Sequence, residues 1–432
     1  MRKLLVLLLL NMVVFSVSAQ KIDQIINAKE VLRIESVLAS DEMQGRKTFT
    51  PGIDKAAAFI AEEFAKMKIA PYPGTQQYLQ SFAMLRPKFL GLQASVNGVP
   101  VDSKNVVVIT CTDTLQINQQ SGYEMVQIAS GENFVTEARK YLNTKKNYCV
   151  IVDSSHAANF GMLTRFKSQL YQSEYSTVFM LTSAKPVDFS VAAYHSFTRQ
   201  SLQNVAAIIP GKSRPNEYVI FSGHYDHLGV MSKDRQGNIL TDSIFNGAND
   251  DAAGTTAMML LAQYFSKQKN NERTLIFVAF TAEEVGGFGA TYFSRQMNPD
   301  EVVAMFNIEM IGTESKWGKN SAYITGFEKT NMGDILQQNL EGTGFTFYPD
   351  PYTTQNLFYR SDNATLARLG VPAHTISTSK MDNEPNYHKA SDEVGTLDMD
   401  NMAMIIKSIA LSARSIISGK DTPSRVDTKQ LK

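Results

Sequence analysis

Residues 274–284 read TLIFVAFTAEE, an apolar run that leads directly into two adjacent acids, Glu283 and Glu284. Continuous apolar runs of this length, without alternating polar positions, are typical of strands buried on both faces. Such strands belong to parallel sheets with helices on both sides, and these sheets hold functional side chains at the carboxyl ends of their strands. The stretch therefore predicts a fold class and also the place of a site.

Apolar strands alternate with amphipathic helices over about residues 201–418, on both sides of this strand in the sequence. We expect further strands at 218–221 and 302–308 and a closing helix at about 399–417. A helix between the strands at 218–221 and 274–280 has its apolar residues on one face: Ala253, Ala257, Leu260, Leu261, Tyr264 and Phe265. The alternation predicts an α/β domain with a mainly parallel, mixed sheet covered by helices on both faces. A polar tail, 419–432, is expected to be loose.

The first part of the chain divides into two regions. Residues 20–85 are expected to form a helical part of the same domain, in which a helix with Ala56, Ile60, Phe64 and Met67 on one face precedes the Pro-Tyr-Pro-Gly turn at 71–74. Residues 86–200 contain short β-like runs, such as 106–109 and 148–152, separated by Gly, Asn, Asp and Ser. This region predicts a smaller, β-rich inserted domain. It has no dense set of His, Asp and Glu, so the chemistry is expected elsewhere.

Residues 1–19 have the three parts of a secretory signal peptide. Arg2 and Lys3 precede an apolar run from Leu4 to Phe15, and the segment ends in the small residues of 17–19. We expect cleavage after Ala19 and export to the periplasm or the extracellular space. No later stretch reaches the ~18 apolar residues of a membrane span, so no stable membrane insertion is expected.

The charge balance and the cysteine content exclude two classes of function. The chain has 42 basic and 42 acidic residues, whereas nucleic-acid binding needs clustered positive charge, so no nucleic-acid partner is expected. Cys111 and Cys149 are the only cysteines. An oxidising compartment would allow them to pair, and the alternative is two small buried hydrophobic residues. Neither is expected to be catalytic.

Two polar motifs follow the strand at 218–221. In the segment 223–229, GHYDHLG, alternation along the strand places His224 and Asp226 on the same side, which suits a metal-bound imidazole oriented by a carboxylate. The alternative is a pair of ordinary polar loop residues. In the segment 246–254, NGANDDAAG, Asp250 stands before a helix, as a metal ligand or as a common N-cap.

Three further motifs complete the set. Adjacent acids cannot easily do the same task, so one of Glu283 and Glu284 is expected to bind a metal and the other to act as general base. Glu309 lies at the end of an apolar strand, where a buried acid needs compensation. His388 stands in the polar loop 386–393. Together the motifs predict a metal-assisted catalytic site.

In this order, the five motifs resemble those of the di-zinc aminopeptidase family that includes aminopeptidase Y, secreted bacterial leucyl aminopeptidases and glutamate carboxypeptidase II. The resemblance covers about residues 204–413 and extends to the helical segment before Met84. It implies the zinc exopeptidase fold, peptide substrates and two Zn²⁺ ions per chain. The metal ligands that it implies are His224 and Glu309 for one ion, Glu284 and His388 for the other, and Asp250 between the two.

The resemblance also implies roles for neighbouring residues. Glu283 would be the general base that takes a proton from a water bridging the metal ions and passes it to the leaving amine. Asp226 would orient His224. Apart from the resemblance, Asp362 and Tyr387 are candidate substrate contacts, and the alternative for each is an ordinary surface or packing residue. Many members of the family carry a protease-associated domain at the position of the insertion.

Two positions depart from the family pattern. Members commonly have Asp where Glu309 stands, and Glu is an oxygen ligand that is one methylene longer, which affects metal spacing or selectivity. Many bacterial relatives read Ser-Asp-His where this chain has Ser361-Asp362-Asn363. That change concerns substrate contacts, because Asn363 is not an expected ligand.

Four readings of the activity remain open at this point. The set favours an exported aminopeptidase that hydrolyses the N-terminal peptide bond, and a carboxypeptidase would use the same metal shell. A glutaminyl cyclase on this fold commonly uses one zinc ion and aromatic residues, and the only tryptophan, Trp317, is near Glu309 in sequence. A non-enzymatic binding protein is the fourth reading. The sequence does not indicate an oligomeric state.

Overall fold

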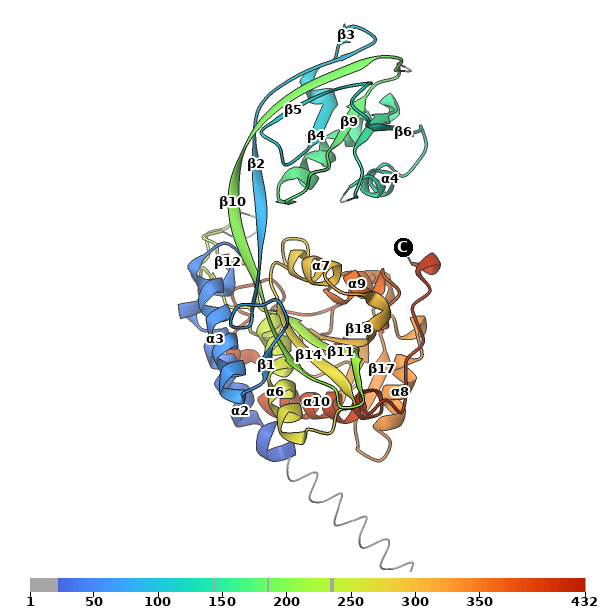
Figure 1. Ribbon diagram of the computed structural model, residues 1–432. Coiled ribbons are helices and arrows are strands. Elements are labelled where there is room, and N and C mark those ends of the chain that lie inside the picture. The colour runs from blue at the N-terminus through green and yellow to red at the C-terminus, as the bar shows by residue number, and fades with distance from the viewer. Residues whose placement is uncertain (1–21, 143, 185, 234–236, 432) are drawn as a thin grey trace, which may run out of the picture. The chain divides into compact units, whose positions relative to one another are not determined.

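The computed structural model describes residues 22–142, 144–184, 186–233 and 237–431 (Figure 1). They fall into two compact units. One consists of residues up to Ser81 together with those from Leu202 onward, and the other is Phe82–Ser201. The expected signal peptide, 1–19, lies outside the described residues.

A large mixed sheet forms the centre of the first unit. Its order is β17 (Thr346–Pro349), β16 (Ser321–Ile324), β18 (Ala373–Ser377), β15 (Val302–Ile308), β11 (Arg214–His224), β14 (Arg273–Phe280) and the end of β10 (Phe189–Ile209). Strand β11 pairs in parallel with β14 and β15, and β15 pairs in parallel with β18. The pairs β10–β14 and β16–β18 are antiparallel. Every residue of β14 is buried, as its apolar sequence predicts.

Helices cover both faces of this sheet, which gives the predicted α/β layers. On one face lie α2 (Ala28–Leu38), α3 (Pro51–Met67), α6 (Ala253–Gln268) and α10 (Met399–Ser412), and on the other lie α7 (Phe288–Arg295) and α9 (Asn363–Ala367). Because side chains alternate along a strand, neighbouring residues enter different clusters. Phe221 packs on the α6 face, where its ring stacks on Phe277 and Phe306 at centroid distances of 5.5 and 4.9 Å. The next residue back, Ile220, belongs to the opposite cluster.

The two ends of this unit differ in part from the expectation. The N-terminal helices end at Met67, and strands β1 (Ala70–Pro71) and β2 (Leu79–Val96) follow, so the helical region is shorter than the predicted 20–85. The prolines and glycine of 71–74 prevent the helix from continuing. The polar tail is not loose throughout, because Val426 is buried and the Arg425 guanidinium donates to the Val302 carbonyl at 2.8 Å.

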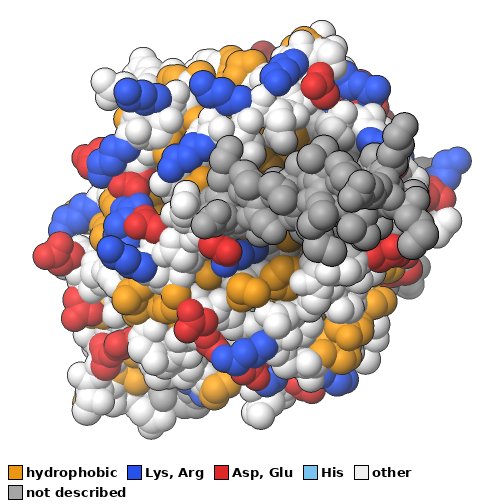
Figure 2. Space-filling model, turned by 90° about the horizontal axis from the view of Figure 1, so that it is seen from below, with side chains coloured by type: hydrophobic (Ala, Val, Ile, Leu, Met, Phe, Trp, Pro, Cys, Tyr) orange, Lys and Arg blue, Asp and Glu red, His pale blue; other side chains and the backbone are white. Residues whose placement is uncertain are grey.

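The remaining strands and α-helices of the first unit, among the described residues, are short. They are β12 (Gly229–Val230), β13 (Ile244–Phe245), α8 (Met332–Asn339) and α11 (Arg414–Ile417). Seen from below, the visible face of the molecule carries Lys and Arg side chains next to Asp and Glu side chains, with hydrophobic groups between them (Figure 2). This face therefore presents charges of both signs. Within the described residues, every helix is too short or too polar to cross a bilayer.

The second unit contains a four-stranded sheet of order β4 (Val106–Ile109), β9 (Thr177–Leu181), β7 (Tyr148–Val152) and β6 (Glu124–Ile128). The strand β7 is parallel to both neighbours, and β4 is antiparallel to β9. Strand β5 (Thr114–Asn118) pairs with β10, β3 (Val99–Pro100) with β2, and β8 (Leu170–Tyr171) with β2. Helix α4 (Phe134–Lys140) contributes Phe134 to the cluster on one face.

The two cysteines of this unit are free thiols, so the pairing alternative is wrong. Cys149 is fully buried in the cluster around Ile151 and Val178, where it acts as a small hydrophobic residue. The Cys111 Sγ lies 3.2 Å from the Tyr171 carbonyl oxygen.

Candidate metal centre

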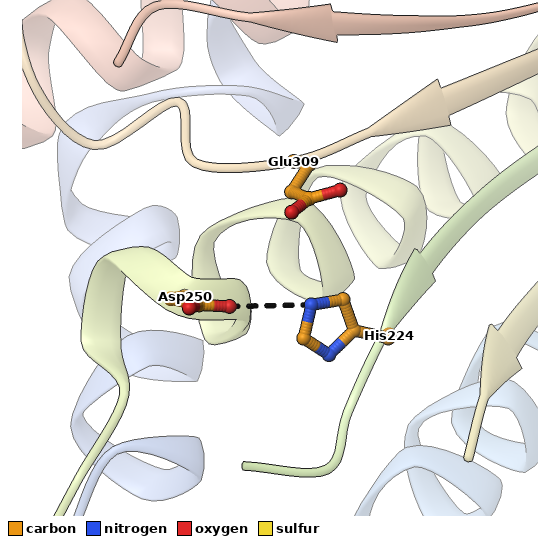
Figure 3. Close-up of side chains that lie close together, drawn as sticks. All are labelled: His224, Asp250 and Glu309. Carbon is orange, nitrogen blue, oxygen red and sulfur yellow. Dashed lines mark ion pairs between the residues drawn. The ribbon is translucent and has the colours of Figure 1, made fainter. Parts of the chain in front are cut away.

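The predicted site residues stand where three adjacent parallel strands end. Strand β11 ends at His224, β14 leads into Glu283 and Glu284, and β15 leads into Glu309. Because β11 lies between β14 and β15, the carboxyl ends of these strands lie side by side. Asp250 precedes α6 and points toward the His224 ring, with Glu309 beside them (Figure 3).

The ligand atoms of the five predicted metal ligands converge. The His224 Nε2 lies 3.2 Å from Asp250 Oδ1, and the His388 Nε2 lies 3.1 Å from Asp250 Oδ2 and 3.2 Å from Glu284 Oε1. Glu309 offers an oxygen within 4.8 Å of the ligand atoms of His224 and Asp250. Two ligands of one tetrahedral zinc ion are about 3.3 Å apart. Each Asp250 oxygen faces a different histidine, which is the arrangement that a bridging carboxylate needs.

Several of these atoms are buried without a hydrogen bond. Among the described residues, the His224 Nε2, the Glu284 Oε1 and the Glu309 Oε2 have no hydrogen-bond partner. Leaving a buried polar atom unsatisfied costs about 1–3 kcal/mol, and more for a charged group. Nitrogen and carboxylate oxygen atoms at these distances are zinc ligands by type. The residues therefore fit the zinc ions that the sequence predicts.

Burial and like charges set the protonation of the acids. Burial raises the pKa of Glu309 and raises that of Glu283 well above its usual value, and neighbouring carboxylates add to both effects. Burial would also raise the pKa of Asp250, but its contacts with His224 and His388 hold it well below the usual value. The centre therefore concentrates more negative charge than its histidines balance.

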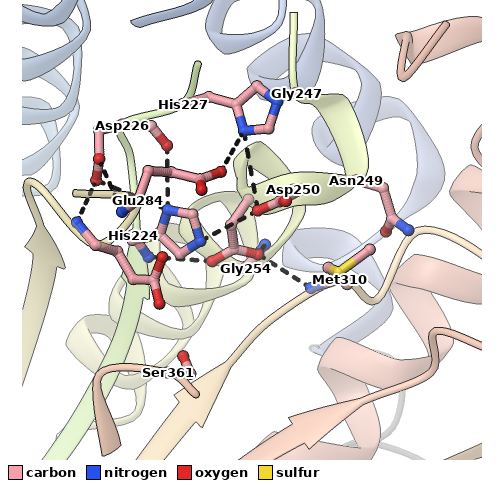
Figure 4. Close-up of polar contacts among 12 residues, drawn as sticks. His224, Asp226, His227, Gly247, Asn249, Asp250, Gly254, Glu284, Met310 and Ser361 are labelled. Carbon is pink, nitrogen blue, oxygen red and sulfur yellow. Dashed lines mark hydrogen bonds and ion pairs between the residues drawn. The ribbon is translucent and has the colours of Figure 1, made fainter. Parts of the chain in front are cut away.

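The contacts of Asp226 differ from the predicted orientation of His224 by its carboxylate. The Asp226 Oδ1 is 3.8 Å from the His224 Nδ1, whereas the Asp226 backbone oxygen is 3.1 Å from that nitrogen. The carboxylate instead accepts the backbone N–H groups of Glu283 and Glu284 at 3.0 and 3.3 Å (Figure 4). Asp226 therefore holds His224 through its carbonyl and the two acids through its side chain.

Two buried acids that the sequence analysis did not single out have the same kind of role. Asp251 accepts the backbone N–H groups of His224, Gly254 and Met310 at 3.0, 2.9 and 3.1 Å. Asp392 accepts those of Asn249 and Asp250 at 2.8 and 3.0 Å. A carboxylate that accepts two or three backbone N–H groups fixes the chain at those residues. The adjacency of Asp250 and Asp251 was a sequence signal for the first of them.

The backbone turns sharply beside the site. Ala282, Met310 and His388 have positive φ angles of 62°, 52° and 56°, a conformation that is uncommon outside glycine. Each is a predicted ligand or lies next to Glu283 or Glu309. Strained backbone of this kind persists where the surrounding structure over-determines it, which is common at active sites.

A buried arginine that the sequence analysis also missed connects two of the loops. Arg46 is 0% exposed, and its guanidinium donates to the carbonyl oxygens of Leu38, Tyr225, Asn246 and Gly247. Tyr225 stands between His224 and Asp226, and the last two acceptors precede Asp250. Arg46 therefore holds in place both the segment that carries His224 and the segment that carries Asp250.

The two candidate substrate contacts lie in different surroundings. The Tyr387 ring stacks on the His388 ring, with centroids 4.0 Å apart, and lines a small cavity of about 40 Å³ together with Glu309, Met310, Leu357 and Met381. Asp362 is 2% exposed and does not line this cavity. Burial raises the pKa of Asp362 to about 8.

Arg46→Lys should lower the free energy of unfolding by about 3–5 kcal/mol, because one ammonium cannot satisfy the buried carbonyl groups that the planar guanidinium reaches. Urea unfolding of the purified protein measures this difference. The matched control is Arg33→Lys at a side chain that is 41% exposed, where a change within about 1 kcal/mol is expected. Equal losses for the two variants would contradict the role given to Arg46.

Comparison with known proteins adds an independent finding. Residues 204–413 match Peptidase family M28. Aminopeptidase YwaD of Bacillus subtilis is 28% identical over 259 residues, which are 58% of this chain and 52% of that protein. Aminopeptidase Y of Saccharomyces cerevisiae is 25% identical over 191 residues, 39% and 34% of the two chains. A probable zinc metalloprotease of Pyrenophora teres f. teres is 32% identical over 118 residues, 27% of this chain and 23% of that one. The matches thus span about half of these relatives or less.

Solved structures support the fold over nearly the whole chain. The aminopeptidase from Aneurinibacillus sp. strain AM-1 has a TM-score of 0.53 at 15% identity and covers 95% of this chain and 98% of its own. BSAP, a zinc aminopeptidase from Bacillus subtilis, has a TM-score of 0.54 at 15% identity, with 93% and 98% covered. The predicted fold class is confirmed. Residues 204–413, which include every predicted metal ligand, are similar in sequence to peptidase family M28.

Proposed function

We propose that this protein is an exported zinc-dependent aminopeptidase, with two Zn²⁺ ions per chain, that hydrolyses the N-terminal peptide bond of peptides. The observation that carries the proposal is the set of contacts at 3.1–3.2 Å among His224, Asp250, His388 and Glu284. The names of the relatives support it, since YwaD and aminopeptidase Y are called aminopeptidases.

Each predicted ligand has a place in this proposal. His224 and Glu309 would hold one ion, Glu284 and His388 the other, and Asp250 would bridge them through its two oxygens. Zinc, when bound, would activate a water for attack and polarise the scissile carbonyl group. The chain's own part is to hold these side chains in place, which Asp226, Asp251 and Asp392 do through their backbone contacts.

Glu283 is the residue that we assign as general base. Its backbone N–H is fixed on Asp226, and its neighbour Glu284 belongs to the ligand cluster. Burial, with the charges of Glu309, Asp362 and Glu284, raises its pKa well above the usual value, while His224 opposes the rise. A raised pKa makes a carboxylate a stronger base, which helps it to take a proton and later to return it. Glu283 would take the proton of the attacking water and pass it to the leaving amine nitrogen.

The small cavity has a mixed wall. Met310, Leu357 and Met381 are apolar, whereas Arg360 is basic and several hydroxyl side chains also line it. An aliphatic side chain can pack against the apolar part, and a Lys or Arg side chain would meet the like charge of Arg360. We therefore expect neutral aliphatic side chains to be preferred over basic ones at the cleaved N-terminal residue. Trp317, which the cyclase alternative would place at the substrate, stacks on Tyr348 at 4.1 Å and is not among the residues that line this cavity.

Glu283→Gln should lower kcat for release of the N-terminal residue by about 10²–10⁴-fold, since glutamine cannot accept the proton. A panel of free and N-blocked dipeptides plus an N-terminal glutaminyl peptide measures the reaction. The control is Glu328→Gln at a side chain that is 74% exposed. Zinc content and melting temperature should stay the same in both variants. Cleavage of N-blocked peptides would point to a carboxypeptidase, a cyclised product to a cyclase, and no reaction with zinc bound to a binding protein.

Zinc affinity should rise with pH up to about pH 9. Burial would lower the pKa of His388, but the carboxylates of Asp250 and Glu284 raise it to about 9, so below that pH zinc must displace a proton. We expect about a tenfold gain in affinity per pH unit for each proton released, levelling off at higher pH. Calorimetry in buffers of different ionisation enthalpy counts these protons. An affinity that is the same at pH 6.5 and pH 9 would contradict this expectation.

Export is the part of the proposal that rests on sequence alone. Its support is the basic, apolar and small-residue order of residues 1–19. Mass spectrometry of the protein recovered outside the cytoplasm should find a chain that begins at Gln20. A full-length chain that is retained in the cytoplasm would remove export from the proposal and leave the peptidase assignment in place.

A further inference from the structure

A third histidine, His227, lies at the metal centre without an assigned role. Its side chain is 0% exposed, and its Nδ1 is 2.9 Å from Glu284 Oε1 and 4.0 Å from Asp250 Oδ1 (Figure 4). The Oε1 atom of Glu284 is also the one that faces the His388 Nε2. One ligand atom from each of His227, Asp250 and Glu284 lies within 4.8 Å of the others, which is close enough to share one metal ion.

The short contact between His227 and Glu284 lacks the alignment of a regular hydrogen bond. Within the described part of the chain, the His227 Nδ1 and the Glu284 Oε1 both have no hydrogen-bond partner. At 2.9 Å the distance suits a hydrogen bond, so the angle must be unfavourable. The two atoms therefore lie beside each other instead of pointing at each other, as two ligands of one ion do.

Packing, and not Glu284, fixes the His227 ring. A Cβ atom at Gly247 would lie 2.5 Å from the ring's Cγ and Cδ2, so the ring lies directly against the Gly247 backbone. The backbone N–H of His227 donates to the Arg46 carbonyl at 3.3 Å, and the His388 ring meets the His227 ring edge-on at a centroid distance of 5.8 Å. The ring nitrogen is thus held toward the carboxylates before any ion arrives.

We propose that His227 is a ligand of the second metal ion through Nδ1, together with Asp250, Glu284 and His388. This rests on the proposed zinc centre. The second ion then has four protein ligands, whereas the ion at His224, Asp250 and Glu309 has three and keeps an open position. Closed tetrahedral shells are typical of structural zinc, and open ones of catalytic zinc. The second ion should therefore be the more tightly held, and a chelator should remove it last.

Two substitutions separate a ligand from a hydrogen-bond donor. The Oδ1 of Asn or Asp stands close to the position of the histidine Nδ1. If His227 is a ligand, His227→Asp keeps an anionic ligand and should bind the second ion more tightly than His227→Asn. If His227 only donates to Glu284, the Asp side chain would repel that carboxylate, and the order would be reversed.

The experiment titrates metal-free protein with zinc against a competing chelator and counts the bound ions. Wild type should bind two ions, and His227→Asn should weaken the tighter one by more than the 10–100-fold that loss of an outer-sphere partner costs. X-ray absorption at the zinc edge should show one histidine fewer per pair of ions, and the Co²⁺ absorption spectrum should change. Metal-free melting temperatures should stay close to wild type, while the gain in melting temperature on adding zinc should shrink.

The matched control is His156→Asn, at a buried histidine of the other unit that contacts the Ala129 carbonyl. It should bind zinc as wild type does. Unchanged zinc affinity and histidine count in His227→Asn would overturn the proposal, as would weaker binding by His227→Asp than by His227→Asn. Wild-type protein that binds two ions but releases no N-terminal residue would instead refute the proposed function alone, because none of these measurements depends on turnover.

Discussion

Buried carboxylates that accept backbone N–H groups hold this centre together. Asp226 fixes Glu283 and Glu284, Asp251 fixes His224 and Met310, and Asp392 fixes Asp250. Each of these contacts joins segments that are far apart in the chain, by 142 residues in the case of Asp392 and Asp250. A metal ligand is useful only if its backbone cannot drift, since a displacement of about 1 Å is enough to spoil a site. The ends of the strands point the ligand side chains toward one another, and the three acids hold the backbone at those residues in place.

The same contacts divide the acids of the centre into two classes. Asp251 and Asp392 lie against backbone N–H groups, which favour their charged form, although burial still raises the pKa of Asp392 to about 6 and that of Asp251 well above its usual value. Glu284 and Glu309 each keep a buried oxygen that lacks a hydrogen-bond partner in the described part of the chain. Water cannot reach these oxygens freely, so their negative charge is compensated only by the histidines or by a cation. The sequence identified Glu284 and Glu309 as ligands. Of the three acids that accept backbone N–H groups, it singled out Asp226 and overlooked Asp251 and Asp392.

The sequence could predict the features that follow from local pattern, and it missed those that depend on contacts between distant segments. The apolar run before Glu283 and Glu284 gives the parallel sheet, and the end of a buried strand gives the place of His224 and Glu309, because both follow from local pattern. His388 has no such pattern in its polar loop and was found only through resemblance. Arg46 was missed, because it acts on carbonyl groups about 200 residues away, which no local motif records. His227 had a visible signal, a second histidine three residues after the first, that strand alternation did not explain.

Glu309 shows how the fold can accept a longer acid at the position where the family resemblance leads us to expect Asp. A Cβ atom at Gly254 would lie 2.0 Å from the Ile308 carbonyl oxygen, so the end of β15 packs directly against the start of α6. The Met310 N–H is bound to Asp251 on the other side of Glu309. The backbone therefore cannot retreat to make room for an extra methylene, and the Glu309 side chain must absorb it by its own rotation. Its carboxylate still reaches the ligand atoms of His224 and Asp250, which means that the longer side chain alters the approach to the ion and not the membership of the site.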